Sequence, residues 1–78
     1  MKERRLRLLL KLGLISPESN ELDVMVVDGA FETAALRQIG FWNITAGMSE
    51  MVENMTRAEQ ATLVASVRAA CPYAHRPD

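Results

Sequence analysis

Apolar residues recur along most of the chain at the three- and four-residue spacings of an amphipathic helix. Within residues 3–12, five leucines provide such contacts: Leu6, Leu8, Leu9, Leu10 and Leu12. Gly13 follows them and supplies a natural C-terminal stop. The pattern therefore predicts a first helix over residues 3–12.

The triplet Ser16-Pro17-Glu18 is typical of a helix start. Serine can cap the exposed backbone amides at the start of a helix. Proline lacks a backbone N–H, but at the first helical position that N–H has no partner within the helix. Glutamate there complements the helix dipole. We predict that a second helix begins here and includes residues 22–27. Three valines in that stretch suit a short strand equally well, so a strand remains the alternative. Helix is favoured because no second convincing strand exists to pair with it.

Helix-forming residues continue over Ala30–Ile39, and Gly29 before them is expected to be a break or a point of close packing. Gly40 ends this stretch. One face of it is apolar and is expected to pack on the core, with the members Phe31, Ala34, Ala35 and Ile39.

A third helix is predicted to run through Met55, with Asn43 or Thr45 as its cap. Its apolar positions fall at helical spacings: Ile44, Met48, Met51, Val52 and Met55. Gly47 inside this pattern weakens the prediction or marks a tight helix contact.

The tetrapeptide Thr56-Arg57-Ala58-Glu59 matches a capping box, in which threonine and glutamate satisfy each other's exposed amides. It predicts the start of a fourth helix, which Pro72 stops. A face of mostly small apolar residues suits close helix packing: Ala61, Val64, Val67, Ala70 and Cys71. We divide the chain into one helical domain, residues 1–72, and a loosely held tail, residues 73–78, from which Tyr73 is able to pack back.

Short connections between these helices predict an all-α fold, a compact bundle of about four helices or an interlocked dimer. The chain has 78 residues, and a core of this size is only marginally stabilising, so a homo-oligomer, most simply a dimer, is expected. Apolar residues make up 49% of the chain, which argues against disorder throughout.

A single cysteine and the lack of a signal-like segment favour the cytoplasm as the compartment. The longest apolar runs, Leu8–Leu10 and Val24–Val27, are far shorter than the roughly 20 residues that a membrane span needs. No membrane partner is therefore expected.

Charge is balanced overall but uneven along the chain. Residues 1–11 carry five basic residues and one acidic residue, whereas residues 12–56 carry seven acidic residues and one basic residue. Solvated helix surfaces are one explanation. The asymmetry could also orient two chains against each other or attract an acidic partner to the N-terminus.

Residues suited to catalysis or to metal binding are few. His75 is the only histidine, and Pro72 interrupts the helix that would align Cys71 with it. Glu50 and Glu53 form an i, i+3 pair without histidine partners, which is more typical of a solvated acidic face than of a metal site. No nucleotide-binding glycine motif occurs. We therefore predict no enzyme activity, no cofactor and no metal.

Two groups of residues are candidates for partner binding. Phe41 and Trp42 follow a glycine, where large aromatics anchor a loop to the core or form an interface. Met48, Met51 and Met55 provide flexible thioethers that fill irregular cores or suit adaptable binding surfaces.

Two segments resemble a known family. Residues 6–18 (LRLLLKLGLISPE) resemble the start of small stand-alone proteins related to the phosphotransferase-system regulation domain, and residues 44–59 (ITAGMSEMVENMTRAE) resemble its central helix. The resemblance implies an all-helical, often dimeric regulatory domain of transcriptional antiterminators and activators controlled by histidine phosphorylation. The family's central helix carries a histidine, whereas Thr45, Ala46 and Gly47 stand in that region here. Only the fold and the regulatory setting therefore carry over.

These observations together predict a non-catalytic regulatory or protein-interaction module, in transcriptional or sugar-uptake regulation. Two alternatives remain: a small DNA-binding transcriptional regulator and an accessory subunit of an enzyme. DNA binding has weak support, because the fourth predicted helix carries only Arg57 and Arg68 as cations.

Overall fold

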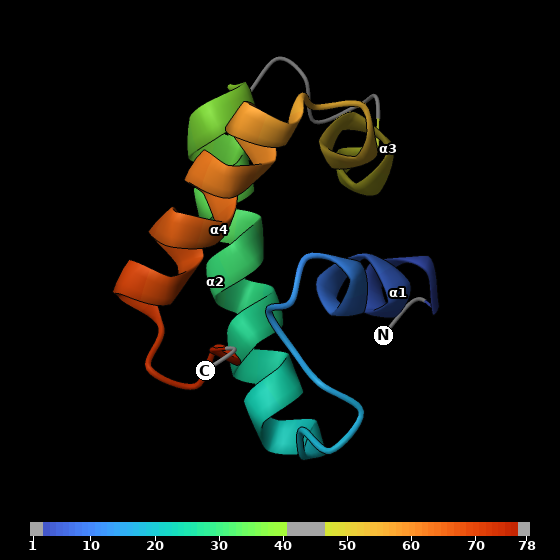
Figure 1. The fold of residues 1–78 in the computed structure, drawn as a ribbon, viewed down its shortest axis with the longest axis vertical. Coiled ribbons are helices and arrows are strands. Elements are labelled where there is room, and N and C mark those ends of the chain that lie inside the picture. The colour runs from blue at the N-terminus through green and yellow to red at the C-terminus, as the bar shows by residue number, and fades with distance from the viewer. Residues whose placement is uncertain (1–2, 41–46, 77–78) are drawn as a thin grey trace.

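The structure, a computed structural model, describes residues 3–40 and 47–76, and all the regular secondary structure in this part is helical. In chain order the helices are α1 (Glu3–Lys11), α2 (Glu21–Ile39), α3 (Met48–Glu53) and α4 (Arg57–Ala70). The longest helix is α2, and the other three helices lie around it (Figure 1). The prediction of an all-α bundle of about four helices is confirmed.

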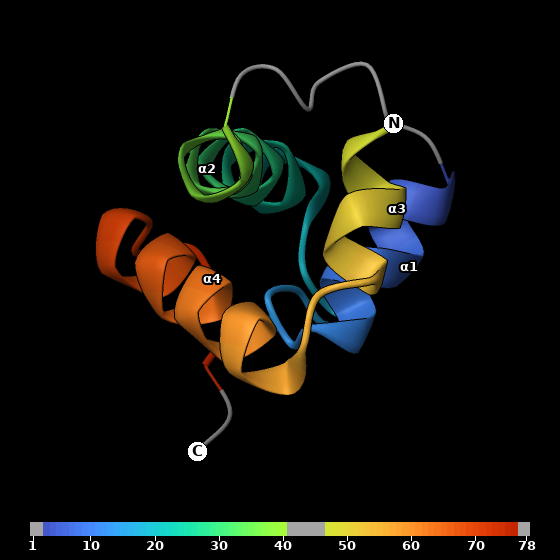
Figure 2. The same cartoon turned by 90° about the horizontal axis from the view of Figure 1, so that it is seen from above.

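α4 packs against α2, while α1 and α3 lie together on another side of it (Figures 1 and 2). The side chain of Gln38, near the end of α2, donates a hydrogen bond of 2.9 Å to the carbonyl of Glu59, near the start of α4. α2 and α4 are therefore antiparallel. Figure 1 shows the first turns of α2 extending past the ends of the other helices.

The core is apolar and draws on every helix and on the segments after α1 and α4. Phe31, in the middle of α2, is fully buried and is its largest member. The buried set is Leu8, Leu9, Leu14, Ile15, Val27, Phe31, Ala35, Val52, Leu63, Val67, Cys71 and Ala74. No polar or charged residue of the described part is buried, so apolar packing supplies the stability of the centre.

The start of α2 differs from the prediction, because Ser16-Pro17-Glu18 does not begin a helix. Ser19 instead closes a turn with Ser16: its backbone N–H donates to the Ser16 carbonyl at 3.0 Å and its Oγ accepts from the Ser16 N–H at 2.9 Å. Asn20 is the N-cap, and its Oδ1 accepts a 2.8 Å hydrogen bond from the N–H of Asp23. Asparagine caps as well as serine does.

Residues 22–27 are helical, and α2 continues without a break through Gly29. The prediction of helix for this stretch is confirmed, and that of a break at Gly29 is wrong. A Cβ placed on Gly29 would meet nothing within 4 Å, so this glycine is not a close packing point within the described chain either. Tertiary burial of Val27 and Phe31 on either side holds the helix together despite the glycine.

α3 is shorter than predicted and begins after Gly47, which precedes the helix with a φ of 87°. The predicted caps Asn43 and Thr45 lie outside the described residues. The capping box that starts α4 is present as predicted. The prediction for the apolar face of α4 is partly wrong. Val67 and Cys71 are buried as predicted, but Leu63 is also buried, whereas Ala61 and Ala70 are exposed.

Residues 73–76 differ from the predicted loose tail. Ala74 is buried, and the N–H of His75 donates to the carbonyl of Leu14 at 2.8 Å. Tyr73, the residue expected to pack back, is 58% exposed.

Candidate protein-binding surface

The predicted partner-binding methionines lie on α3 and in the segment after it. Met48, Met51 and Met55 are each half-buried, and Met48 and Met55 pack against the core. The sulfur of Met48 accepts from Arg5 Nη1 at 3.7 Å, and that of Met55 accepts from Gln38 Nε2 at 3.9 Å. Phe41 and Trp42 lie outside the described residues. Partner binding by these five residues stays a prediction.

A different set of apolar side chains faces outward, on the first half of α2. Leu22 is 70% exposed, Met25 62% and Val26 42%. These positions and the exposed Gly29 and Thr33 share one side of the helix, because three, four and seven residues bring the chain back to the same side. We call Leu22, Met25, Val26, Gly29 and Thr33 the α2 outer face.

The sequence contained a signal for this face. Val24, Val27 and Phe31 form the stripe that packs on the core, so the apolar residues between them necessarily fall on another side of the same helix. Residues 22–27 are therefore apolar on two sides.

A groove lies beside the α2 outer face, between α2 and α4. It has a volume of 600 Å³, and both helices contribute small and polar side chains to it. Its lining residues include Gly29, Thr33 and Arg37 from α2 and Ser66 and Ala70 from α4. It is open to solvent and is not an enclosed cavity, so it extends the outer face sideways.

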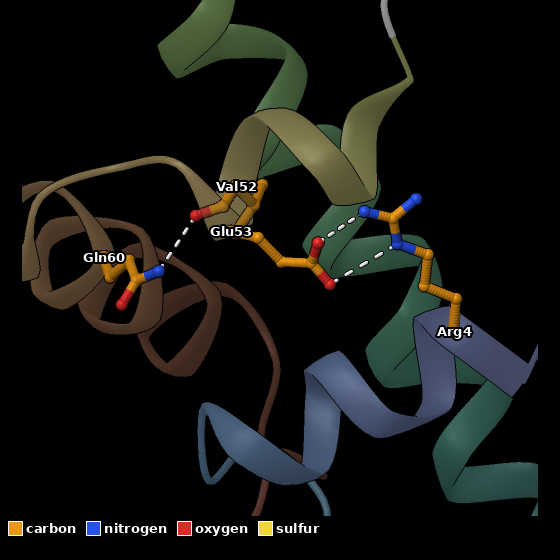
Figure 3. Close-up of polar contacts among 4 residues, drawn as sticks. All are labelled: Arg4, Val52, Glu53 and Gln60. Atoms are coloured by element: carbon orange, nitrogen blue, oxygen red, sulfur yellow. Dashed lines mark hydrogen bonds and ion pairs between the residues drawn. The ribbon is translucent and has the colours of Figure 1, made fainter.

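The basic residues of α1 are partly committed to pairs within the fold. Arg4 Nη2 lies 2.5 Å from Glu53 Oε1 on α3 (Figure 3). The hydrogen bond that Arg4 donates lowers the pKa of Glu53, and the same bond raises the pKa of Arg4. Figure 3 also shows Gln60 donating to the carbonyl of Val52, at 2.9 Å, which ties α4 to α3.

Arg5 makes the corresponding link from α1 to α2. Its guanidinium lies 3.5 Å from Asp28, 3.9 Å from Glu32 and 5.2 Å from the centre of the Phe31 ring. Asp28 Oδ1 is buried and accepts no hydrogen bond from the described residues. Attraction to the partly buried Arg5 therefore offsets the cost of removing this one oxygen from water.

The candidate reactive groups are not assembled into a recognisable centre. Cys71 is buried at the end of α4, whereas His75 is exposed beyond it. Within residues 3–40 and 47–76, no three His, Cys, Asp or Glu side chains are grouped so that they could hold a metal ion. In the same residues, no helix has both the length and the hydropathy required to span a membrane.

No protein-family model, curated protein or solved structure matches the chain. The resemblance to the phosphotransferase-system regulation domain therefore stays a prediction, and the α2 outer face has to be interpreted from its own physical chemistry.

Proposed function

We propose that this chain is a non-catalytic module that acts by binding another protein chain through the α2 outer face. The observation that carries the proposal is the exposure of Leu22, Met25 and Val26 together on one side of one helix. Single exposed apolar residues are ordinary on protein surfaces. A contiguous group on a helix that already has a buried stripe is typical of a binding site, because covering it removes apolar area from water.

The position of this group in the fold supports the same function. It lies on the first turns of α2, and Figure 1 shows these turns extending past the ends of the other helices. An amphipathic helix face with anchors three and four residues apart is a recurrent mode of protein recognition. The resemblance noted above suggests transcriptional or sugar-uptake regulation as the setting.

The DNA-binding alternative has less support. Arg4 and Arg5, two of the α1 cations, already pair with carboxylates, which reduces their availability to phosphates. Of the remaining α1 cations, Arg7 and Lys11 have no ion pair within the described part of the chain. Two such charges would give weak, salt-sensitive contact and little sequence readout.

Site-specific photocrosslinking in the native host tests the proposal. A photoreactive amino acid at Met25 should yield a covalent adduct with a protein, whether another copy of the chain or a different protein. The same amino acid at Ala65, an exposed position on α4, is the matched control and should yield little adduct. The absence of any adduct from position 25, or equal adducts from both positions, would contradict the proposal.

A further inference from the structure

We propose that Met25, on the α2 outer face, is a site of reversible oxidation by hydrogen peroxide, and that its sulfoxide form no longer holds the partner protein. This inference rests on the proposed function and adds a means of regulating the same surface. It follows from where the fold places the sulfur atoms of the chain.

Met25 differs in exposure from the other methionines that the structure describes. It is 62% exposed, whereas the methionines on α3 and in the segment after it are each half-buried. Met25 also lines an open groove of 630 Å³, beside Leu6 of α1 and Val24 of α2. Peroxide dissolved in water therefore reaches its sulfur without any rearrangement of the helices.

Other sulfur atoms in the described part of the chain are held within the fold. The sulfurs of Met48 and Met55 accept hydrogen bonds from Arg5 and Gln38, and both side chains pack against the core. Cys71 is 2% exposed, so its thiol is shielded as long as the chain is folded. Met25 is therefore the sulfur most open to modification in residues 3–40 and 47–76.

The reaction needs only the thioether and the peroxide. The sulfur attacks one peroxide oxygen, an S–O bond forms, the O–O bond breaks and water leaves, so the sulfur loses two electrons and the peroxide gains them. Hydrogen peroxide is neutral, and the carboxylates of Glu21 and Asp28 in the same groove do not repel it as they would repel an anionic oxidant. Methionine sulfoxide reductases reverse the modification.

Oxidation at this position changes binding more than folding. Leu22, Met25 and Val26 together present the apolar area whose removal from water favours binding. A sulfoxide oxygen among them would lose its hydration when the partner covers the face. In the free chain the same oxygen stays in water, so the fold is retained while the complex is weakened.

Peptide mass spectrometry tests the selectivity of the reaction. Trypsin separates the methionines, because the peptide of residues 12–37 contains Met25 alone and that of residues 38–57 contains Met48, Met51 and Met55. In dilute peroxide, Met25 of the folded chain should be oxidised at least about twofold faster than any of these three. The control is the same chain in urea, where the four rates should converge. Equal rates in the folded chain overturn the inference.

Photocrosslinking tests the effect on binding, with the photoreactive amino acid at Val26 so that the Met25 sulfur stays in place. The purified chain is oxidised, freed of peroxide and added to an extract of the native host. The yield of adduct should fall at least about threefold, and treatment of the oxidised chain with methionine sulfoxide reductase should restore it. Met25→Leu is the matched control, and its yield should not change with peroxide because leucine carries no sulfur.

The outcomes separate this inference from the proposed function. Adducts that form equally before and after oxidation, or that are lost equally in Met25→Leu, overturn the regulation by Met25 and leave the proposed function standing. If the unoxidised chain gives no adduct with a protein, the proposed function and the regulation fail together.

Discussion

At the scale of single residues, Gly13 holds the turn after α1 in a conformation that side chains rarely adopt, with a φ of 74°. Its N–H donates to the carbonyl of Leu10, and the next N–H, of Leu14, donates to the carbonyl of Leu9, each at 3.0 Å. Arg68 Nη2 donates to the Gly13 carbonyl at 3.0 Å. One glycine therefore ends a helix and presents its carbonyl to α4.

Gly13→Ala should destabilise the fold by about 1–2 kcal/mol, because an L side chain is strained at this positive φ. The space itself is adequate, since the new Cβ would meet Arg68 Nη2 at an ordinary 3.5 Å. Gly13→Asn is the control and should lose less, because asparagine tolerates the left-handed region. Urea denaturation followed by circular dichroism measures both. An alanine variant as stable as the original would contradict the assignment of strain.

At the scale of elements, α4 shows how far local chemistry fixes a helix. The Thr56 N–H donates to Glu59 Oε1 at 2.9 Å and the Glu59 N–H donates to Thr56 Oγ1 at 3.1 Å, so two exposed donors are satisfied within four residues. This reciprocal pair depends on residues adjacent in sequence, which is why the start of α4 could be predicted.

Thr56→Ala should cost about 1 kcal/mol of folding stability, since the alanine cannot accept the Glu59 N–H. Thr62→Ala is the matched control on the same helix. Thr62 is exposed and its Oγ1 donates to the carbonyl of Ala58, so its loss should be neutral or slightly stabilising, because alanine is the better helix former. Thermal unfolding of the two variants gives the comparison, and similar losses in both would exclude a special role for the cap.

The pair Arg4–Glu53 joins α1 to α3 and should make stability depend on pH. The folded pKa of Glu53 is below its ordinary value of 4.5, so its contribution is fully present above pH 4.5 and is lost as the pH falls through the folded pKa. Glu53→Gln should therefore be less stable than the original chain at pH 7, with the difference closing in acid. Urea titrations at several pH values measure this.

Glu50→Gln is the control for that pH series, because it removes one charge from the same helix at a residue without an ion pair in the described part of the chain. The gap between the original chain and this variant should vary less with pH. If the two variants show the same dependence, the net charge of α3 and not the pairing is responsible.

The start of α2 shows where local reasoning stops. Ser16 and Asn20 are both acceptable caps, and adjacent residues alone do not decide between them. The choice depends on tertiary packing. Because Leu14 and Ile15 are buried, the chain after α1 first packs against the core, and α2 begins only after that segment. The outer face of α2 was missed for a related reason, since only the fold determines which of two apolar sides of a helix is covered.

At the scale of the whole molecule, the C-terminal segment connects α4 to the turn after α1. The Arg68 side chain donates to the carbonyls of Gly13 and His75, and Arg76 Nη2 donates to the Arg68 carbonyl at 2.7 Å. These contacts join residues from the two ends of the sequence. Residues 73–76 could not be predicted as part of the body, because a short segment after a proline has no periodic pattern and Ala74 is too small to stand out.

Burial of Ala74 is therefore the feature that decides whether this segment belongs to the folded domain. Ala74→Glu should destabilise the fold by at least about 2 kcal/mol. The position is 5% exposed, so the new carboxylate would lose its hydration without gaining a hydrogen bond or an ion pair in return. Tyr73→Glu, one residue earlier and 58% exposed, should change stability by no more than about 0.5 kcal/mol. Both are measured by chemical denaturation. Equal, small effects at the two positions would contradict this assignment and would favour the prediction that residues 73–78 form a loosely held tail.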